Sequence, residues 1–339
     1  MDTESVADSE MSDPSEWGGR SLPLVVGGLV LSLMLVFFWL TGALFPADSN
    51  GLDMSPAQIT GMALTYSVTP AFLLASLIYS HRRTRISIDQ LVDLGRVDLV
   101  ATNAQVRSVG GAGLGLTGNV AATLLGLFLG AAQVTWARVF DSLGDPGMSY
   151  VLSIAIGNIW TWLVVVHVVM RRVVASADLR RLGQSSTKID LLRPDTLLPF
   201  GRVATLHLLM VAIAVSLSAL QSLDAELRWV NYSAALAAGI PAGLVLVLLP
   251  MLGIRHSVRV AKRCTLEELD AAIEHADREL EPDALRYLSD LLHQRETIAN
   301  ARDWPLDTTA FSRIAIYFVI PPIAWVGGAL VEILVAAAI

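Results

Sequence analysis

Two apolar stretches of this sequence contain hydroxyl and amide side chains, which suit the binding of a small solute better than bond-breaking chemistry. These groups lie within residues 57–80 and 149–170, among mostly apolar neighbours: Thr65, Ser67, Thr69, Asn158 and Thr161. Hydroxyls and amides can each accept hydrogen bonds and donate them. A set of them inside an apolar protein can therefore replace the water around a solute. We expect these five residues to line a path for a small solute or an ion.

Prolines at a similar depth in three apolar stretches favour the same interpretation. They are Pro70, Pro241, Pro321 and Pro322. A proline removes one backbone N–H, so the carbonyl one turn earlier needs another partner, water or a ligand. Interrupted helices that meet in the middle of a membrane build the binding sites of many transporters. The pattern also fits plain helix packing, because proline and glycine are common in membrane helices.

The charged residues restrict the kind of solute. The 24 lysines and arginines gather at the edges of the apolar stretches, and no charged residue lies in the middle of one. A carboxylate buried in the membrane is the usual relay for protons or sodium. We therefore favour a channel, or a carrier of a neutral or anionic solute, over an ion-coupled transporter.

Enzyme, metal and cofactor chemistry find little support. The sequence has no H-E-x-x-H, G-x-S-x-G or P-loop motif, and Cys264 is its only cysteine. Four histidines fall at the same predicted membrane edge without ligand-type spacing on one helix: His81, His167, His207 and His256. A metal or pH-sensing cluster there is the alternative to ordinary interfacial histidines. We expect no catalytic residue, no metal and no cofactor.

Small residues recur every four positions in one stretch. Gly118, Ala122, Gly126 and Gly130 would form a ribbon along one helix face, where another helix can approach closely. The partner helix would belong to this chain or to a second copy in a homo-oligomer. Residues 113–118 also match G-x-G-x-x-G, but they open an apolar stretch where a dinucleotide site needs a preceding strand.

The elements that position these residues are long apolar segments. The chain is 54% hydrophobic and only 16% charged. A helix needs ~20 residues to cross ~30 Å of hydrocarbon. Seven stretches approach or exceed that length: 21–45, 57–80, 114–136, 149–170, 203–221, 232–254 and 312–335. The sequence predicts an all-α polytopic membrane protein with seven transmembrane helices, in three in-out-in hairpins plus a final span.

Orientation follows from the distribution of lysine and arginine, which favour the cytoplasmic side. With the N-terminus inside, only Arg138 and Arg228 of the 24 basic residues lie outside. We expect a multi-pass protein of a prokaryotic-type plasma (inner) membrane with its C-terminus outside. Its partners would be the lipid bilayer and no nucleic acid. Residues 1–20 would form an acidic, disordered cytoplasmic tail, and 21–263 the six-span bundle.

A cytoplasmic helical hairpin is expected over residues 264–303, ahead of a seventh span and short outer C-terminus over 304–339. Thr265 and Glu268 have the spacing of a capping box at a helix start. Leu285, Leu288, Leu292 and Ala299 would form the apolar stripe of the second arm. The hairpin is either a structural connector or, over 264–302, a docking site for a cytosolic protein. Two functions follow: a small-solute or ion channel or transporter, or alternatively a membrane-anchored scaffold or sensor.

Overall fold

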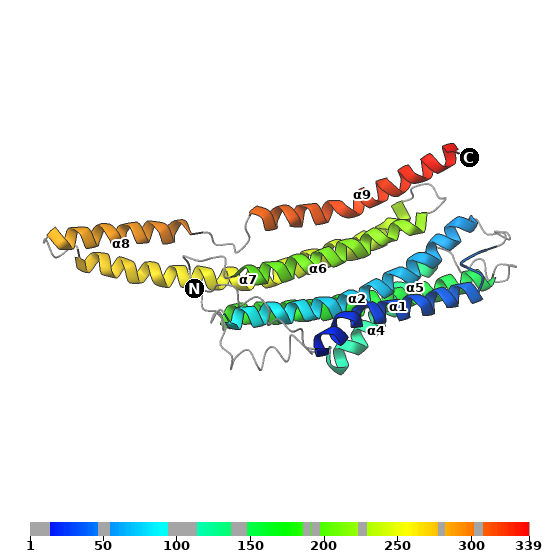
Figure 1. Ribbon diagram of the computed structural model, residues 1–339, viewed down its shortest axis with the longest axis horizontal. Helices are drawn as coiled ribbons and strands as arrows, with labels where there is room; N and C mark the ends of the chain where they lie inside the picture. The colour runs from blue at the N-terminus through cyan, green and yellow to red at the C-terminus, as the bar shows by residue number, and fades with distance from the viewer. Residues whose placement is uncertain are drawn as a thin grey trace, which may run out of the picture.

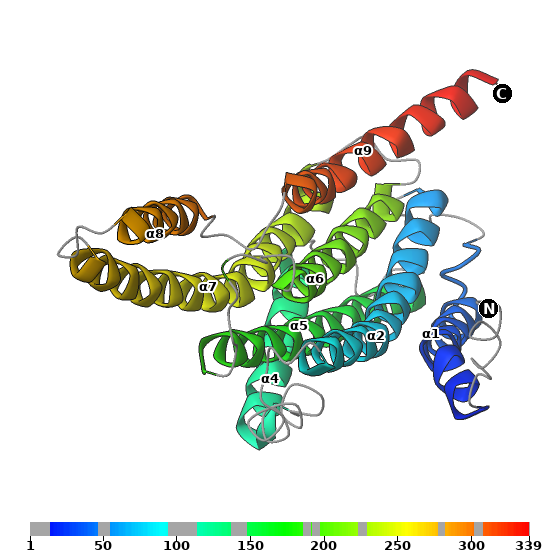
Figure 2. The same ribbon diagram turned by 60° about the vertical axis from the view of Figure 1, so that its left-hand side comes forward.

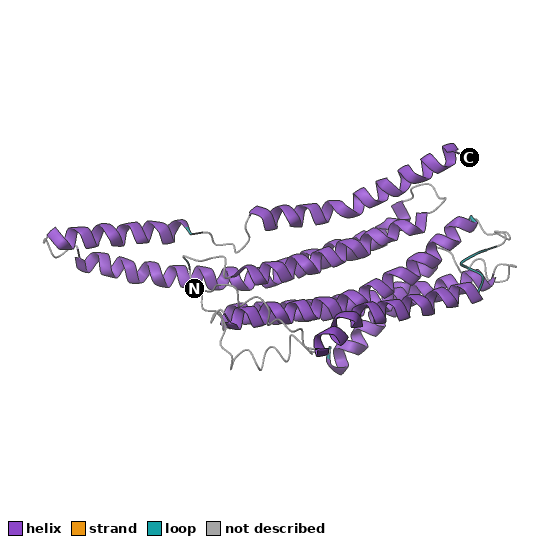
Figure 3. Ribbon diagram, in the orientation of Figure 1, coloured by secondary structure: helices purple, strands orange, loops and turns teal. Residues whose placement is uncertain are grey.

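The computed structural model describes residues 14–46, 55–93, 114–136, 148–185, 191, 197–222, 229–276, 282–301 and 308–338. Throughout these ranges the regular structure is helical, without a strand (Figure 3). The helices are α1 (Pro14–Leu40), α2 (Pro56–Asp93), α4 (Gly115–Trp136), α5 (Met148–Ser185), α6 (Leu198–Ser216), the 3-10 helix η3 (Leu217–Ser222), α7 (Trp229–Ala276), α8 (Pro282–Asn300) and α9 (Thr308–Ala338).

Four helices form a closed ring at the centre of the molecule. Around this ring α2 contacts α5, α5 contacts α7, α7 contacts α6, and α6 contacts α2. Each ring helix carries one outer helix: α1 packs on α2, α4 on α5, α9 on α6 and α8 on α7 (Figures 1 and 2). The interior of the ring is therefore a place where four long helices can jointly surround a solute.

The outer surface of the described bundle is apolar, as expected for contact with lipid. Within the described ranges, six helices are long and apolar enough to cross a membrane: α1, α2, α4, α5, α6 with η3, and α7. Large apolar side chains are strongly exposed on the outer helices, among them Leu24 at 77% and Leu116 at 82%. A soluble monomer rarely exposes such continuous apolar surface. The predicted seventh span falls in α9, whose described apolar segment, Ser312–Gly327, is shorter.

The expected interruptions at the prolines do not occur. α2 continues through Pro70, α7 through Pro241, and α9 through Pro321 and Pro322. A proline removes only one intrahelical hydrogen bond, and neighbouring helices can hold the two halves together. The prolines therefore lie within continuous helices, and α2 changes direction along its length rather than stopping (Figure 2).

Three ring helices extend far beyond the predicted spans. α2 and α5 each contain 38 residues and α7 contains 48. At ~1.5 Å per residue, α7 is about 72 Å long, more than twice the thickness of the hydrocarbon core. The predicted helix start at Thr265 is wrong, because Thr265 lies inside α7 and its Oγ1 donates to Ala261 O at 3.0 Å. α1 begins at Pro14, inside the predicted tail of residues 1–20. The rest of that tail, residues 1–13, lies outside the described ranges.

The extended ends of α2, α5 and α7, with the start of α6, enclose a filled core. We call this the basic end, because Arg82, Arg83, Arg180, Arg181 and Arg259 lie on these segments. Its core consists of buried apolar side chains: Ile88, Leu91, Leu179, Leu182, Leu197, Phe200, Val203, Ala204, Met251, Ile254 and Val258. α5 and α7 touch there almost backbone to backbone, since a Cβ on Gly253 would lie 2.5 Å from Arg180 O. The ring is therefore closed at the basic end.

Beyond the basic end, α8 folds back along the last part of α7. Leu291 and Ile298 of α8 are buried, whereas the predicted stripe residue Leu292 is 49% exposed. Arg295 Nε donates to Asp270 Oδ1 at 2.5 Å, and this hydrogen bond raises the pKa of Arg295 above its ordinary value. Lys262 Nζ donates to Ala301 O at 3.0 Å. The last part of α7 and α8 thus form a helical hairpin, whose first arm is the end of a ring helix.

Candidate functional site

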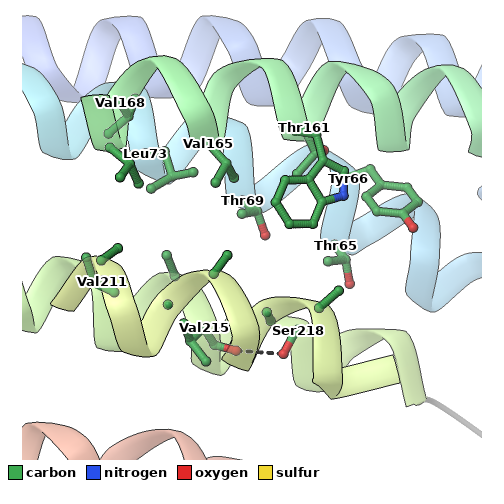
Figure 4. A pocket seen from close by; sticks show the side chains of 18 of the residues that line it. Thr65, Tyr66, Thr69, Leu73, Thr161, Val165, Val168, Val211, Val215 and Ser218 are labelled. Carbon is green, nitrogen blue, oxygen red and sulfur yellow. Dashed lines mark hydrogen bonds between the residues drawn. The ribbon is translucent and has the colours of Figure 1, made fainter. Parts of the chain in front are cut away.

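A cavity of about 110 Å³ lies inside the ring. All four ring helices line it, together with η3 and one residue of α4. Figure 4 shows that hydroxyl groups gather at one end and apolar side chains at the other. The lining thus has two chemically different parts along the axis of the bundle.

The polar part of the cavity consists mainly of hydroxyls that donate to a backbone carbonyl three or four residues earlier in the chain. Thr65 Oγ1 donates to Gly61 O at 2.9 Å, Thr161 Oγ1 to Gly157 O at 2.8 Å, and Ser218 Oγ to Val215 O at 2.6 Å. Each of these hydroxyl oxygens can still accept a hydrogen bond. This end therefore presents acceptors to a solute, with Gln221 and Ala234 at its half-buried margin.

Two amide side chains join α4 to the same part of the ring. Asn158 Nδ2 donates to Gly130 O at 3.1 Å, and Trp162 Nε1 donates to Gln133 Oε1. Asn158 and Gln133 both line the cavity, so α4 contributes to the site although it lies outside the ring. Their side-chain groups are held in place by a neighbouring helix, which is the rigid support that a binding site needs.

Thr69 is the hydroxyl of the polar part whose hydrogen-bonding capacity is unused. Its side chain is buried at 7% exposure, yet Oγ1 has no hydrogen-bond partner among the described residues. Figure 4 shows this oxygen directed into the cavity. Pro70 follows it and lacks the N–H that would bond to the carbonyl of Tyr66, another lining residue. A free hydroxyl and a carbonyl without its helical donor therefore lie one turn apart beside the cavity.

Toward the basic end, the lining becomes apolar and ends at an arginine. Leu73, Val168 and Val211 are all buried, and beyond them lies Arg172, only 2% exposed. Arg172 Nη2 donates to Ser76 Oγ at 2.6 Å. Arg172 is therefore buried inside the protein, which the sequence pattern did not predict. Arg171 next to it is exposed, because neighbouring residues point about 100° apart around a helix.

The predicted path residues divide into two groups. Thr65, Thr69, Asn158 and Thr161 line one cavity although they come from two helices. The others do not line it: Ser67, Pro70, Pro241, Pro321 and Pro322. Ser67 is fully buried and donates to Ala63 O at 2.8 Å, while Pro241 is exposed on the outer face of α7.

The ribbon of small residues faces α5 of the same chain. A Cβ on Gly126 would lie 2.9 Å from Leu163 Cα, and one on Gly130 would lie 2.8 Å from Ile159 Cα. Ala122, about one turn before Gly126 on α4, is fully buried. Gly118 differs, since a Cβ there would meet only Leu114 of its own segment. The close approach of α4 to α5 thus depends on Gly126 and Gly130.

The four histidines are dispersed over four helices. His167 lies within 3.4 Å of Thr123 Oγ1 and 2.8 Å of Leu163 O, and His256 is exposed. His207 is buried on α6. Across the described ranges, no three histidine, cysteine, aspartate or glutamate residues come together as metal ligands.

Sequence reasoning missed Arg172, Ser218 and Gln133. The signal for Arg172 was present in the spacing of α5, where Asn158, Thr161, Val165, Val168 and Arg172 recur at alternating steps of three and four. That spacing defines one helix face. Ser218 and Gln133 carry no comparable signal, because they reach the cavity only through the placement of η3 and α4.

The fold and the site define a class: an all-helical membrane protein whose central four-helix ring encloses a partly polar cavity. No protein-family model, no curated protein and no solved structure matches this chain.

Proposed function

We propose that this protein carries or conducts a small solute across the membrane through the ring of α2, α5, α6 and α7. The observation that supports the proposal is the cavity, where hydroxyls and amides from separate helices meet inside an otherwise apolar ring. Buried polar groups without partners are costly, so an unused donor such as Thr69 Oγ1 favours a ligand or water at that position.

The proposed path begins at the polar end of the cavity and stops at the filled core of the basic end. Passage would require α5 and α7 to separate where Gly253 meets Arg180 and where Ser257 Oγ donates to Gly183 O at 2.6 Å. The excess of arginine at the basic end favours a cytoplasmic location for it, in a plasma membrane. The conformation would then be closed toward the cytoplasm.

A flux assay tests the proposal. The full chain is reconstituted in liposomes, and uptake of urea, glycerol and propionate is followed by stopped-flow light scattering. Ala238→Phe places a ring in the cavity and should abolish flux, while Leu248→Phe on the exposed face of the same helix should leave it unchanged. Thr69→Leu removes the free hydroxyl and should also reduce flux. Equal flux in Ala238→Phe and wild type would refute the path.

A second candidate is a membrane sensor, which one observation favours. α7 runs without interruption from the cavity residues Ala234–Ala242 to the hairpin that it forms with α8. A ligand that shifts α7 could therefore change the hairpin presented to a cytosolic partner. Solute binding that protects α8 from hydrogen exchange, without any flux in liposomes, would select the sensor over the transporter.

A further inference from the structure

Arg172 is a buried charge whose partners within the chain do not satisfy it. It is the largest side chain among the fully buried residues of the described ranges. Nη2 bonds to Ser76 Oγ, but Nε and Nη1 have no hydrogen-bond partner among the described residues. A buried cation in a membrane protein is costly unless another group compensates it. The site therefore lacks a negative charge.

No carboxylate among the described residues pairs with Arg172, which donates to Ser76 Oγ. On α2, Asp89 and Asp93 lie 13 and 17 residues beyond Ser76, at least about 20 Å along the helix. On α5 the nearest acid is Asp178, which lies six residues away, so about 9 Å along the axis and about 120° around the helix. Asp178 already accepts a hydrogen bond from Arg181 at 3.3 Å. α6 and η3 contain no acidic residue, and α7 has none before Glu267.

Other groups beside Arg172 also have unused hydrogen-bonding capacity. Ser176 Oγ, one turn farther along α5, and His207 Nδ1 on α6 are both buried without a partner in the described part of the chain. His207 precedes the lining residue Val211 by one turn of α6. Arg172 and Ser176 of α5 and His207 of α6 thus have unpaired polar atoms, and no acid pairs with Arg172 in the described part of the chain.

We propose that Arg172 anchors the carboxylate of a short-chain monocarboxylate, whose alkyl part lies against Leu73, Val168 and Val211. This inference rests on the proposed solute path and names its substrate class. The apolar lining next to Arg172 selects against a fully hydrated inorganic anion. Such an ion would lose water on the sides that face Leu73, Val168 and Val211 and would gain no polar contact from them.

The geometry of the guanidinium suits a carboxylate. Nη2 has two N–H groups. One of them points parallel to the N–H of Nε, and the other points parallel to an N–H of Nη1. Ser76 Oγ accepts from one of the two Nη2 N–H groups. The other Nη2 N–H and its parallel neighbour stay available for the two oxygens of a carboxylate. Such bidentate pairs are among the strongest hydrogen-bonded contacts in proteins.

The size of the cavity limits the alkyl chain. An apolar cavity of about 150 Å³ accommodates benzene, with six heavy atoms. By proportion, 110 Å³ accommodates about four or five heavy atoms. Acetate and propionate have that size, whereas longer fatty acids would exceed the volume of the cavity.

Direct binding to the purified full chain in detergent tests the inference. Equilibrium dialysis at pH 7 with radiolabelled propionate gives the affinity, and propionamide serves as a neutral competitor of the same shape. Wild type should prefer propionate by at least ~10-fold, since a charge-assisted pair replaces a neutral contact. Arg172→Gln should lose this preference and keep its affinity for propionamide.

The controls separate the possible failures. Circular dichroism and thermal unfolding establish that Arg172→Gln is folded. If it is not, Arg172→Lys decides, because it keeps the charge and loses the planar fork. Its affinity for propionate should fall several-fold, and an unchanged affinity would overturn the inference.

Equal binding of propionate and propionamide by wild type would also overturn the inference, while flux of urea or glycerol would still support the proposed path. Displacement of propionate by equimolar chloride would show an inorganic anion site and reject the monocarboxylate. Propionate binding that depends on Arg172 in a protein without flux would uphold the site and reject transport.

Discussion

Gly130→Ala should weaken the contact between α4 and α5, although alanine is the better helix former. The added Cβ would lie 2.8 Å from Ile159 Cα and 3.2 Å from Ile159 Cγ1, and the backbone atom cannot move without its helix. Overpacking of this kind costs about 1–3 kcal/mol. Alanine recovers about 0.5–1 kcal/mol of helix propensity. The net loss should be up to about 2.5 kcal/mol, and about 1 kcal/mol at the middle of these ranges.

The matched control is Gly28→Ala in α1, where a Cβ would meet nothing within 4 Å. There only the propensity gain applies, so stability should stay equal or rise by up to about 1 kcal/mol. Unfolding by SDS in mixed micelles, followed by circular dichroism, measures both variants. Because Asn158 donates to Gly130 O, Gly130→Ala should also impair solute flux. A Gly130→Ala protein as stable as Gly28→Ala would refute the close helix contact.

Three further predictions concern the hairpin, the orientation and the buried arginine. Leu291 is buried, so Leu291→Ala should destabilise the α7–α8 hairpin by about 2–4 kcal/mol. Leu292 is exposed, so Leu292→Ala should destabilise it by less than about 0.5 kcal/mol. Hydrogen exchange of α8 distinguishes the two variants. Cys264 is exposed and is the only cysteine of the sequence. If the basic end is cytoplasmic, a membrane-impermeant maleimide should label Cys264 in inverted vesicles and leave it unlabelled in intact cells. Labelling in intact cells would reverse the predicted orientation of the chain. Ser76→Ala removes the acceptor of the Arg172 hydrogen bond and should lower the free energy of unfolding by about 1.5–3 kcal/mol. The control Ser80→Ala loses a hydrogen bond to Leu77 O and none to a charged group. Equal stabilities of the two variants in SDS unfolding would contradict the role of Ser76.

The sequence was sufficient to predict the helical class and most spans, because uninterrupted apolar segments of sufficient length have few other structures available to them. It was a poor guide to where the helices end. The capping signal at Thr265 was overridden because no proline or loop lies directly before it, so α7 simply continues. The prolines were misleading for the related reason that one missing hydrogen bond does not stop a helix packed on both sides.

The site was predictable only where one helix carried the pattern. Thr65 and Thr69 lie one turn apart on α2, and Asn158 and Thr161 lie one turn apart on α5, so each pair shares a face. That the two faces meet is a property of the ring, which the sequence does not encode locally. Arg172 was assigned to the membrane edge because it follows Arg171, and only packing distinguishes an exposed arginine from a buried one.

The two proposed functions differ in what must happen at the basic end. A transporter has to open the core around Leu182 and Ile254, which would break the contact of Gly253 with Arg180. A sensor can keep that core intact and use it as a rigid connection between the cavity and the hairpin. Arg172 lies between cavity and core in both cases. Neutralising its charge with an anion therefore changes the electrostatics of the closed end directly, so occupation of the cavity and opening of the core become coupled through one side chain.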